Sequence, residues 1–190
     1  MLTVVDSIAP NLLDRQFVAT GPNQKWAADF TYVRTAEGWL FVAAVLDLYC
    51  RRVVGYSIQS TMSAQLVMDA LLMAIFRPGR PQAVLHHSDR LNSPSTPAKI
   101  CSGCWTHTAL LAAWADVETA GSVNAAVESF FSTLKTVRLS RKQYRTRDGL
   151  RADVLDYIKR FYNPKRRHST IGYISPVQFG NFQCAKRMCP

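Results

Sequence analysis

The sequence is poor in cysteine, in long apolar runs and in acidic residues, and each shortage excludes a class of protein. Five cysteines among 190 residues are too few and unpaired in number for a disulfide scaffold, and they fit free thiols in a reducing cytoplasm. No apolar run reaches about 18 residues without a charge, so we expect no membrane span. The start, Met1-Leu-Thr-Val-Val-Asp, lacks the basic and apolar regions of a signal peptide, and we expect a cytoplasmic protein.

Acidic residues number 13 against 23 Lys and Arg, and the imbalance is confined to the last third of the chain. Residues 1–130 hold 9 basic and 10 acidic residues, a net charge of −1, whereas residues 131–190 hold 14 and 3, a net charge of +11. Tyr144, Tyr157 and Phe161 are interleaved with these charges, which favours an ordered basic face over a solvated tail. Such a face predicts a nucleic acid partner.

Hydrophobic periodicity predicts one α/β domain with strands and helices in a defined order. An antiparallel meander followed by β-α units predicts a mixed sheet with helices on both faces. We expect Trp26 and Trp39 to lie in the core. The expected strands cover residues 27–34, 39–48, 51–59 and 83–88, and the expected helices cover roughly 64–76, 124–138 and 148–162.

Three carboxylates stand where a metal site would need them. Asp29 begins a strand-like run, Asp89 ends the run Ala83-Val-Leu-His-His-Ser, and Glu128 lies in an expected helix. Carboxylates on two strands and a helix can converge on a pair of hard cations, which prefer oxygen ligands. Each acid alone is more simply read as a capping or surface carboxylate, but together they predict phosphoryl transfer on a nucleic acid.

Several rigidly spaced stretches resemble bacterial insertion-sequence transposases that have a retroviral-integrase-like catalytic core. The resemblance implies an RNase H-like fold with a five-stranded mixed sheet, the catalytic triad Asp29, Asp89 and Glu128, two Mg²⁺ or Mn²⁺ ions, and DNA cleavage followed by strand transfer. It also implies a homo-oligomer on DNA at the bacterial nucleoid, and a separate helix-turn-helix chain as a possible partner. The stretches are Asn23-Gln-Lys-Trp-Ala-Ala-Asp-Phe-Thr-Tyr, Glu37-Gly-Trp-Leu-Phe-Val-Ala-Ala-Val-Leu-Asp-Leu, Arg51-Arg-Val-Val-Gly-Tyr, His86-His-Ser-Asp-Arg, Asn124-Ala-Ala-Val-Glu-Ser-Phe-Phe-Ser-Thr-Leu-Lys and Phe161-Tyr-Asn-Pro-Lys-Arg-Arg-His.

The resemblance also suggests roles for residues around the triad. Lys135 lies seven residues after Glu128, two helical turns along the same face, where it would hold a substrate phosphate rather than merely face solvent. We expect Asp47 to be structural. The other expected DNA contacts are Arg138, Arg166, Arg167 and His168, with plain surface charge as the alternative for the last three, and His87 and Asn124 are expected beside the metal ligands.

The expected organisation is a lead-in over residues 1–24, a catalytic core over 25–140, a basic helical part over 141–180 and a tail over 181–190. Within the core, residues 91–123 depart from the family pattern. Codons chosen for Pro94 to Gly121 and read one base earlier give QYTSEDLQRLLDTHGIACSMGRRGNCW, the kind of sequence that the family has at this place. We therefore hypothesise that residues 91–123 are translated out of frame between two compensating indels.

This hypothesis predicts a recognisable fold with a damaged sector and weak or no activity. Unrelated sequence would replace the family's fifth strand, and residues 108–118 could form a short helix instead. Two other functions remain open: a catalytically dead DNA-binding or oligomerisation module, and an RNase H-like nuclease that cuts without joining.

Overall fold

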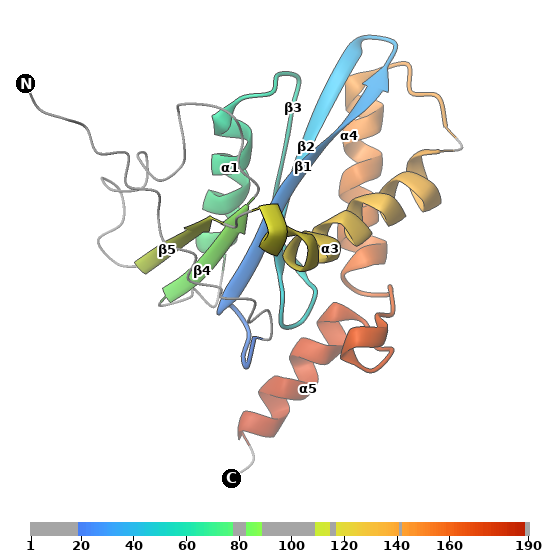
Figure 1. Cartoon of the computed structure of the whole chain (residues 1–190). Helices are drawn as coiled ribbons and strands as arrows, with labels where there is room; N and C mark the ends of the chain where they lie inside the picture. Colours follow the sequence, from blue (N-terminus) through green and yellow to red (C-terminus); the bar gives the residue numbers. More distant parts are fainter. Residues whose placement is uncertain (1–18, 78–82, 89–108, 115–116, 141, 189–190) are drawn as a thin grey trace, which may run out of the picture.

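The computed structural model describes residues 19–77, 83–88, 109–114, 117–140 and 142–188, and it contains a five-stranded sheet in the order β3-β2-β1-β4-β5 (Figure 1). Strands β1 (Lys25–Thr35), β2 (Gly38–Asp47) and β3 (Val53–Gln59) form an antiparallel meander. Strand β4 (Ala83–Ser88) runs parallel to β1, and β5 (Ala109–Trp114) runs parallel to β4. The predicted mixed sheet is confirmed.

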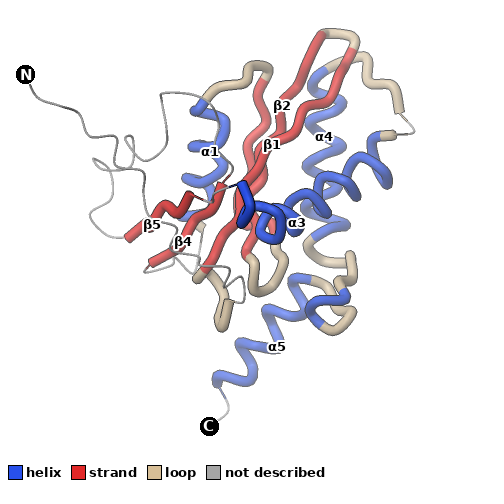
Figure 2. The backbone as a smooth tube through the Cα atoms, viewed as in Figure 1, coloured by secondary structure: helices blue, strands red, loops and turns tan. Residues whose placement is uncertain are grey.

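Helices cover both faces of this sheet (Figure 2). Helix α1 packs on one face, and α3 and α4 pack on the other. A further helix, α5, extends away from the sheet at the carboxyl end (Figure 1). The helical segments are α1 (Ala64–Ile75), α3 (Val117–Thr133) with its π-helical continuation η2 (Leu134–Leu139), α4 (Arg147–Asp156) with its π-helical continuation η3 (Tyr157–Tyr162), the 3₁₀ turn η4 (Ser169–Ile171) and α5 (Pro176–Met188).

Two hydrophobic clusters separated by the sheet form the core. Alternate residues of a strand point to opposite faces, so Trp26 and Ala28 pack toward α1 while Ala27 packs toward α3 and α4. Gly55 brings β3 against the backbone of α1: a Cβ on Gly55 would lie 2.0 Å from the carbonyl oxygen of Ala70. The meander and α1 therefore form a closely packed unit.

The structure corrects two expectations from the sequence. Trp26 is 1% exposed, as predicted, but Trp39 is 47% exposed, because Trp39 lies near the hairpin turn, beyond the part of the sheet that α1 covers. The helix suggested for residues 108–118 was also wrong, since residues 109–114 form β5. The apolar run Ala109-Leu-Leu-Ala-Ala-Trp suits a parallel strand as well as it suits a helix.

The carboxyl-terminal part of the chain is anchored to the meander by side chains. Asn163 accepts a hydrogen bond from the Val53 amide at 3.0 Å and donates one to the Val53 carbonyl at 3.1 Å. The rings of Tyr49 and Phe179 lie 5.2 Å apart and connect α5 to the same region.

Within the described ranges, no helix is long and apolar enough to cross a membrane.

Candidate active site

Asp29 follows the last β1 residue that is paired with β4 among the described residues. Residues Lys25 to Ala28 pair with β2 on one side and with β4 on the other, and the last parallel pair joins Ala28 to Ser88. From Asp29 onward, β1 is paired with β2 alone among the described strands. The Phe30 amide donates to Asp29 Oδ1 at 2.7 Å, so the half-buried carboxylate is held at this position.

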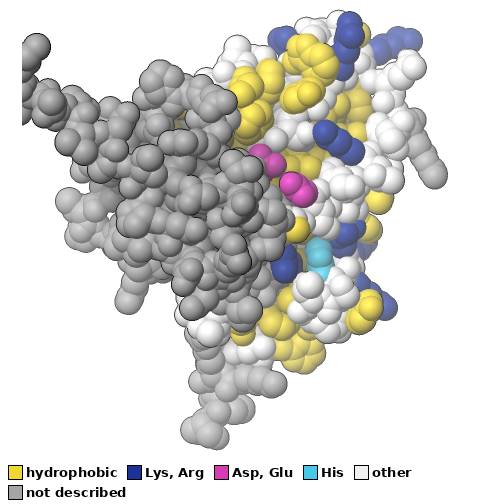
Figure 3. Space-filling model, in the orientation of Figure 1, with side chains coloured by type: hydrophobic (Ala, Val, Ile, Leu, Met, Phe, Trp, Pro, Cys, Tyr) yellow, Lys and Arg dark blue, Asp and Glu magenta, His cyan; other side chains and the backbone are white. Residues whose placement is uncertain are grey.

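Glu128 lies on α3, which packs across the same face of β1 that carries Asp29. Val127 and Phe130 of α3 are fully buried in one cluster with Ala27, and Glu128 itself is exposed. Figure 3 shows acidic side chains near the middle of this view, with hydrophobic and basic side chains close by. The core contacts therefore bring the element that carries Glu128 onto the strand that carries Asp29.

The third predicted acid, Asp89, lies outside the described residues and directly follows Ser88 in the sequence. The described ranges contain no group of three or more His, Cys, Asp or Glu that could hold a metal ion. Two carboxylates on adjacent elements supply the oxygen ligands that Mg²⁺ or Mn²⁺ prefers, so this part of the donor set fits such an ion. For His87 and Asn124, only the backbone is described. His87 pairs with Ala27, and Asn124 lies in α3.

Lys135 reaches from η2 to the aromatic side chains of β1. It is exposed, and its Nζ lies 5.9 Å from the centroid of the Tyr32 ring. Tyr32 follows Asp29 by three residues, and Lys135 follows Glu128 by seven. The positive charge predicted beside the acids is therefore present on the same helical segment and next to the same strand.

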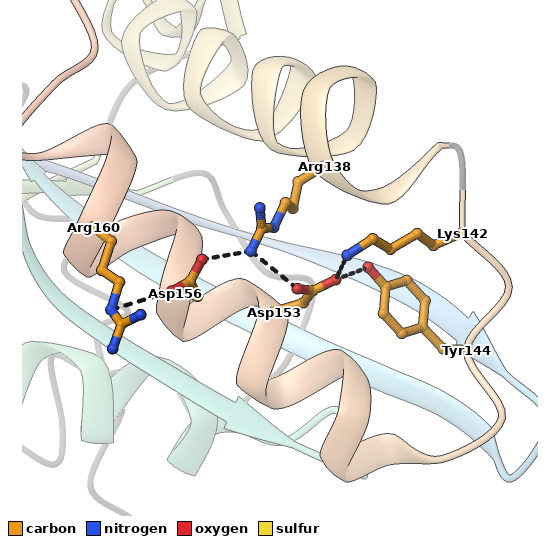
Figure 4. A network of polar contacts seen from close by, with 6 residues as sticks. All are labelled: Arg138, Lys142, Tyr144, Asp153, Asp156 and Arg160. Carbon is orange, nitrogen blue, oxygen red and sulfur yellow. Dashed lines mark hydrogen bonds and ion pairs between the residues drawn. The ribbon is translucent and has the colours of Figure 1, made fainter.

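Arg138, three residues after Lys135, is engaged differently (Figure 4). Its guanidinium forms ion pairs with Asp156 and, at 3.2 Å, with Asp153 of α4. Lys142 binds the other oxygen of Asp153 at 2.6 Å, and the Tyr144 hydroxyl donates to that oxygen at 2.6 Å. This network connects η2 to α4, so the described contacts of Arg138 are structural.

Asp153 is ionised in this network. Burial acts to raise its pKa, but the hydrogen bonds from Lys142 and Tyr144 and the charge of Arg138 outweigh burial, and the pKa of Asp153 lies below its ordinary value. Burial, followed by the bond to Asp153, raises the pKa of the Tyr144 hydroxyl. The network therefore holds a carboxylate and a neutral phenol together across the physiological pH range.

The basic group after η3 contains one exposed and two packed residues. Arg167 is exposed, whereas the Arg166 guanidinium lies 5.7 Å from the centroid of the Tyr162 ring. The His168 ring lies 5.2 Å from that of Tyr162. Burial, and then the charges of Arg166 and Arg51, lowers the pKa of His168 to about 4, so His168 is neutral at pH 7. DNA contact by this group stays a prediction, for which Arg167 is the best placed.

Asp47 has the structural role expected of it. It is 1% exposed, accepts hydrogen bonds from the amides of Asn23 and Tyr49 at 2.9 Å each, and contacts the Cys50 thiol at 3.5 Å. Burial raises its pKa, while these hydrogen bonds lower it, and burial dominates. Because its oxygens accept hydrogen bonds from Asn23, before β1, and from Tyr49, in the turn after β2, Asp47 ties that turn to the start of β1.

Sequence reasoning missed an exposed pair of aromatic rings on the β1–β2 hairpin. Tyr32 is 56% exposed and Trp39 is 47% exposed, and their ring centroids lie 5.2 Å apart. The alternation of β1 and β2 shows which face a side chain points to, but not how far the covering helix extends. The signal that was available is the aromatic content of both strands close to their shared turn.

Comparison with solved structures supports the fold. A simian T-cell lymphotropic virus intasome in complex with PP2A regulatory subunit B56 gamma matches 85% of this chain and 55% of its own chain, at 15% identity and a TM-score of 0.61. The catalytic core domain of BIV integrase matches 87% of this chain and 98% of its own, at 16% identity and a TM-score of 0.54. The trimeric form of the HTLV-2 integrase catalytic core domain, in complex with magnesium, has a TM-score of 0.51 at 15% identity, covering 86% and 99%. The architecture is thus that of an integrase catalytic core.

Sequence comparisons identify the family within this fold class. Two family models, both described as "Integrase core domain", match residues 19–95 and 128–183. The chain is 42% identical over 182 residues to "Transposase InsF for insertion sequence IS3A" of Escherichia coli (strain K12), covering 92% of this chain and 59% of the relative. It is 38% identical over 178 residues to "Insertion element IS600 uncharacterized 31 kDa protein" of Shigella sonnei, covering 90% and 62%. The chain belongs to the integrase-core family of insertion-sequence transposases, and it spans less than two thirds of the length of these relatives.

Proposed function

We propose that this chain is a DNA transposase core that cleaves and joins DNA strands with the help of two divalent metal ions. The observation that carries the proposal is the placement of Asp29 and Glu128 on β1 and α3, two elements that pack together next to the last described pair of β1 with β4. The Phe30 amide donates a hydrogen bond that orients the Asp29 carboxylate. Val127 and Phe130 pack the helix that carries Glu128 into the core.

In this proposal Asp29, Asp89 and Glu128 hold the ions, which are Mg²⁺ or Mn²⁺ because all three ligands are carboxylates. When bound, such ions stabilise the charge that develops on the attacking and leaving oxygens of a phosphodiester. The negative charge of the three carboxylates would offset the charge of the ions. The buried residues beside Asp29 and Glu128 keep these two ligands in place before DNA binds.

Lys135 binds a DNA phosphate next to the acids, and the basic carboxyl-terminal third extends this contact along the backbone. The protein acts as a homo-oligomer on DNA in the bacterial nucleoid, and a helix-turn-helix segment on a separate chain recognises the ends of the element. An intasome among the structural neighbours supports an assembly of this kind. The resolved ion pairs of Arg138 favour Lys135 over Arg138 as the phosphate contact.

We also propose that residues 91–123 are read out of frame and that the chain as translated has little activity. The two integrase-core matches leave residues 96–127 unmatched between them, and this gap overlaps the proposed segment. The segment includes the connection that follows Asp89, so its replacement would misplace one ligand. A displacement of about 1 Å at a catalytic group can cost about a hundredfold in rate.

A strand-cleavage and joining assay on labelled DNA carrying the element's ends tests the proposal, with Mn²⁺ or Mg²⁺ against EDTA. The frame-restored chain should cleave and join, and Asp29→Asn should abolish both while leaving DNA binding intact. Cleavage without joining would favour an RNase H-like nuclease. Salt-sensitive DNA binding without cleavage in the frame-restored chain would favour a catalytically dead DNA-binding or oligomerisation module.

A further inference from the structure

Two large aromatic side chains lie exposed on the β1–β2 hairpin, on the face of the sheet that α1 covers farther along the strands. The Tyr32 and Trp39 rings meet edge to face at an interplanar angle of 86°, and the Phe41 ring lies 6.3 Å from Tyr32. Phe30 and Phe41 still pack against the α1 side of the core, whereas Tyr32 and Trp39 extend the same face into solvent. Adjacent exposed rings of this size commonly mark a binding surface.

The turn that carries these rings is fixed to the rest of the molecule. The Ala36 amide donates to the Tyr144 carbonyl at 2.9 Å, and the Arg147 amide donates to Glu37 Oε2 at 2.8 Å. Inside the turn, the Thr35 hydroxyl donates to the Gly38 carbonyl at 2.8 Å. Because the turn is bonded to the segment before α4 and across its own ends, the rings are preorganised and little ordering entropy is lost when a ligand binds.

A positively charged side chain lies close to each of the two rings. Lys135 Nζ lies 5.9 Å from the Tyr32 centroid, and Arg34 Cζ lies 5.9 Å from the Trp39 centroid. Arg147 approaches the turn closely enough that its Nη2 would lie 2.9 Å from a Cβ on Gly38. Figure 3 shows hydrophobic side chains with Lys or Arg side chains close by in the upper part of this face. The surface thus offers aromatic faces for flat groups and positive charge for anions.

We propose that the Tyr32–Trp39 pair is a stacking platform for unpaired bases of a DNA strand whose phosphates are held by Lys135 and Arg34. This inference rests on the proposed function, because Tyr32 follows Asp29 by about 10 Å along β1, at about 3.3 Å per residue, with its side chain on the other face of the strand. Aromatic rings flanked by basic side chains are the usual means of binding single strands without sequence preference. The platform therefore selects DNA that is frayed or single-stranded next to the site of cleavage.

A duplex alone does not satisfy the platform, since its base faces are hidden in the stack and become available only when bases are unpaired. A protein partner fits less well. The buried centres of protein interfaces are depleted in lysine, whereas here a lysine lies over one of the two rings. An unpaired strand uses both the rings and the charge.

Fluorescence anisotropy without divalent metal tests the proposal on this chain. The probes are a labelled blunt duplex of about 20 base pairs and the same duplex with a single-stranded overhang of about five nucleotides, which fits the span of one single-strand site. Trp39→Leu and Tyr32→Leu remove the rings but keep apolar volume, and Trp39→Phe restores a ring. Tyr173→Leu is the matched control, because Tyr173 is 70% exposed and lies on a different surface, near η4.

We expect Trp39→Leu and Tyr32→Leu each to weaken binding of the overhang probe by about tenfold, and of the blunt duplex by less than about twofold. Trp39→Phe should keep most of the preference for the overhang, and Tyr173→Leu should change neither affinity. Circular dichroism melts establish that each variant is folded. Equal losses of affinity for the two probes, or no loss for either, would overturn the proposal of a stacking platform.

Analytical ultracentrifugation tests whether a second copy of the chain binds this surface instead. A concentration-dependent dimer that Trp39→Leu dissociates would also overturn the proposal, in favour of contact between two copies. The result is separable from the proposed catalysis. Asp29→Asn should keep the overhang preference, so a platform without cleavage leaves this inference standing and contradicts only the catalytic proposal.

Discussion

The two halves of β1 differ in their described strand neighbours and in the exposure of their aromatic side chains. From Lys25 to Ala28 the strand has neighbours on both sides, and Trp26 is 1% exposed. From Asp29 to Thr35 it has β2 alone among the described strands, and Tyr32 is 56% exposed. The first half stabilises the sheet, and the second half displays an acid and an aromatic ring.

The difference shows how one strand can serve both stability and function. The paired half is held on both sides, so the position of Asp29 is set before any ligand binds. In the second half, Lys135 reaches from η2 to within 5.9 Å of the Tyr32 ring centroid. Variants that change one part of the hairpin or the elements packed on it test this distinction.

The sharpest contrast is between the two tryptophans of the hairpin. Trp26→Ala removes a fully buried ring and should lower the free energy of unfolding by about 3–5 kcal/mol. Trp39→Ala removes a ring that is 47% exposed and should cost less than about 1 kcal/mol. Urea denaturation followed by far-UV circular dichroism measures both values. Similar losses for the two variants would mean that the two ends of the β1–β2 hairpin are not energetically distinct.

Restoring the reading frame across residues 91–123 should act on catalysis much more than on the fold. We expect metal-dependent DNA nicking to rise at least about a hundredfold over this chain, because the connection after Asp89 regains the sequence that positions it. Initial rates on a supercoiled plasmid give the ratio. Equal rates for the two chains would remove the frame hypothesis.

Arg138 and Lys135 provide a comparison within one helical segment. Arg138→Gln leaves Asp153 and Asp156 without their shared partner and should lower the free energy of unfolding by about 1–2 kcal/mol. Lys135→Gln should change it by less than about 0.5 kcal/mol. Instead, Lys135→Gln should reduce the slope of log affinity for DNA against log salt by about 1. The reverse pattern would exchange the roles given to these two residues.

The smallest effect is a pH dependence from Asp153. Its pKa is lower in the folded chain than in the unfolded chain, so its contribution to stability is complete above the unfolded pKa and is lost as pH falls through the folded pKa. The parent should therefore lose stability more steeply than Asp153→Asn as the pH falls below the ordinary pKa of an aspartate. Comparing melts of the parent and of Asp153→Asn isolates it. A parent and variant with parallel pH profiles would show that the network does not favour ionised Asp153.

Much of the fold could be predicted because the signals are local. The alternation of β1, the apolar run of β2 and the cap before α1 are visible within single windows of sequence. Trp39 was misjudged because alternation does not reveal where α1 stops. The role of Arg138 also escaped, since its partners, Asp153 and Asp156, belong to another helix and nothing in the spacing identifies them.

The measurement that tests the account most directly is DNA cleavage by the frame-restored chain in Mn²⁺, alongside Asp29→Asn and the matched control Asp69→Asn. Asp69 binds the side chains of Gln59 and Gln65, away from the proposed site. The account predicts cleavage by the parent and by Asp69→Asn, and none by Asp29→Asn. Undiminished cleavage by Asp29→Asn, with EDTA still abolishing it, would contradict the assignment of Asp29 to the metal site.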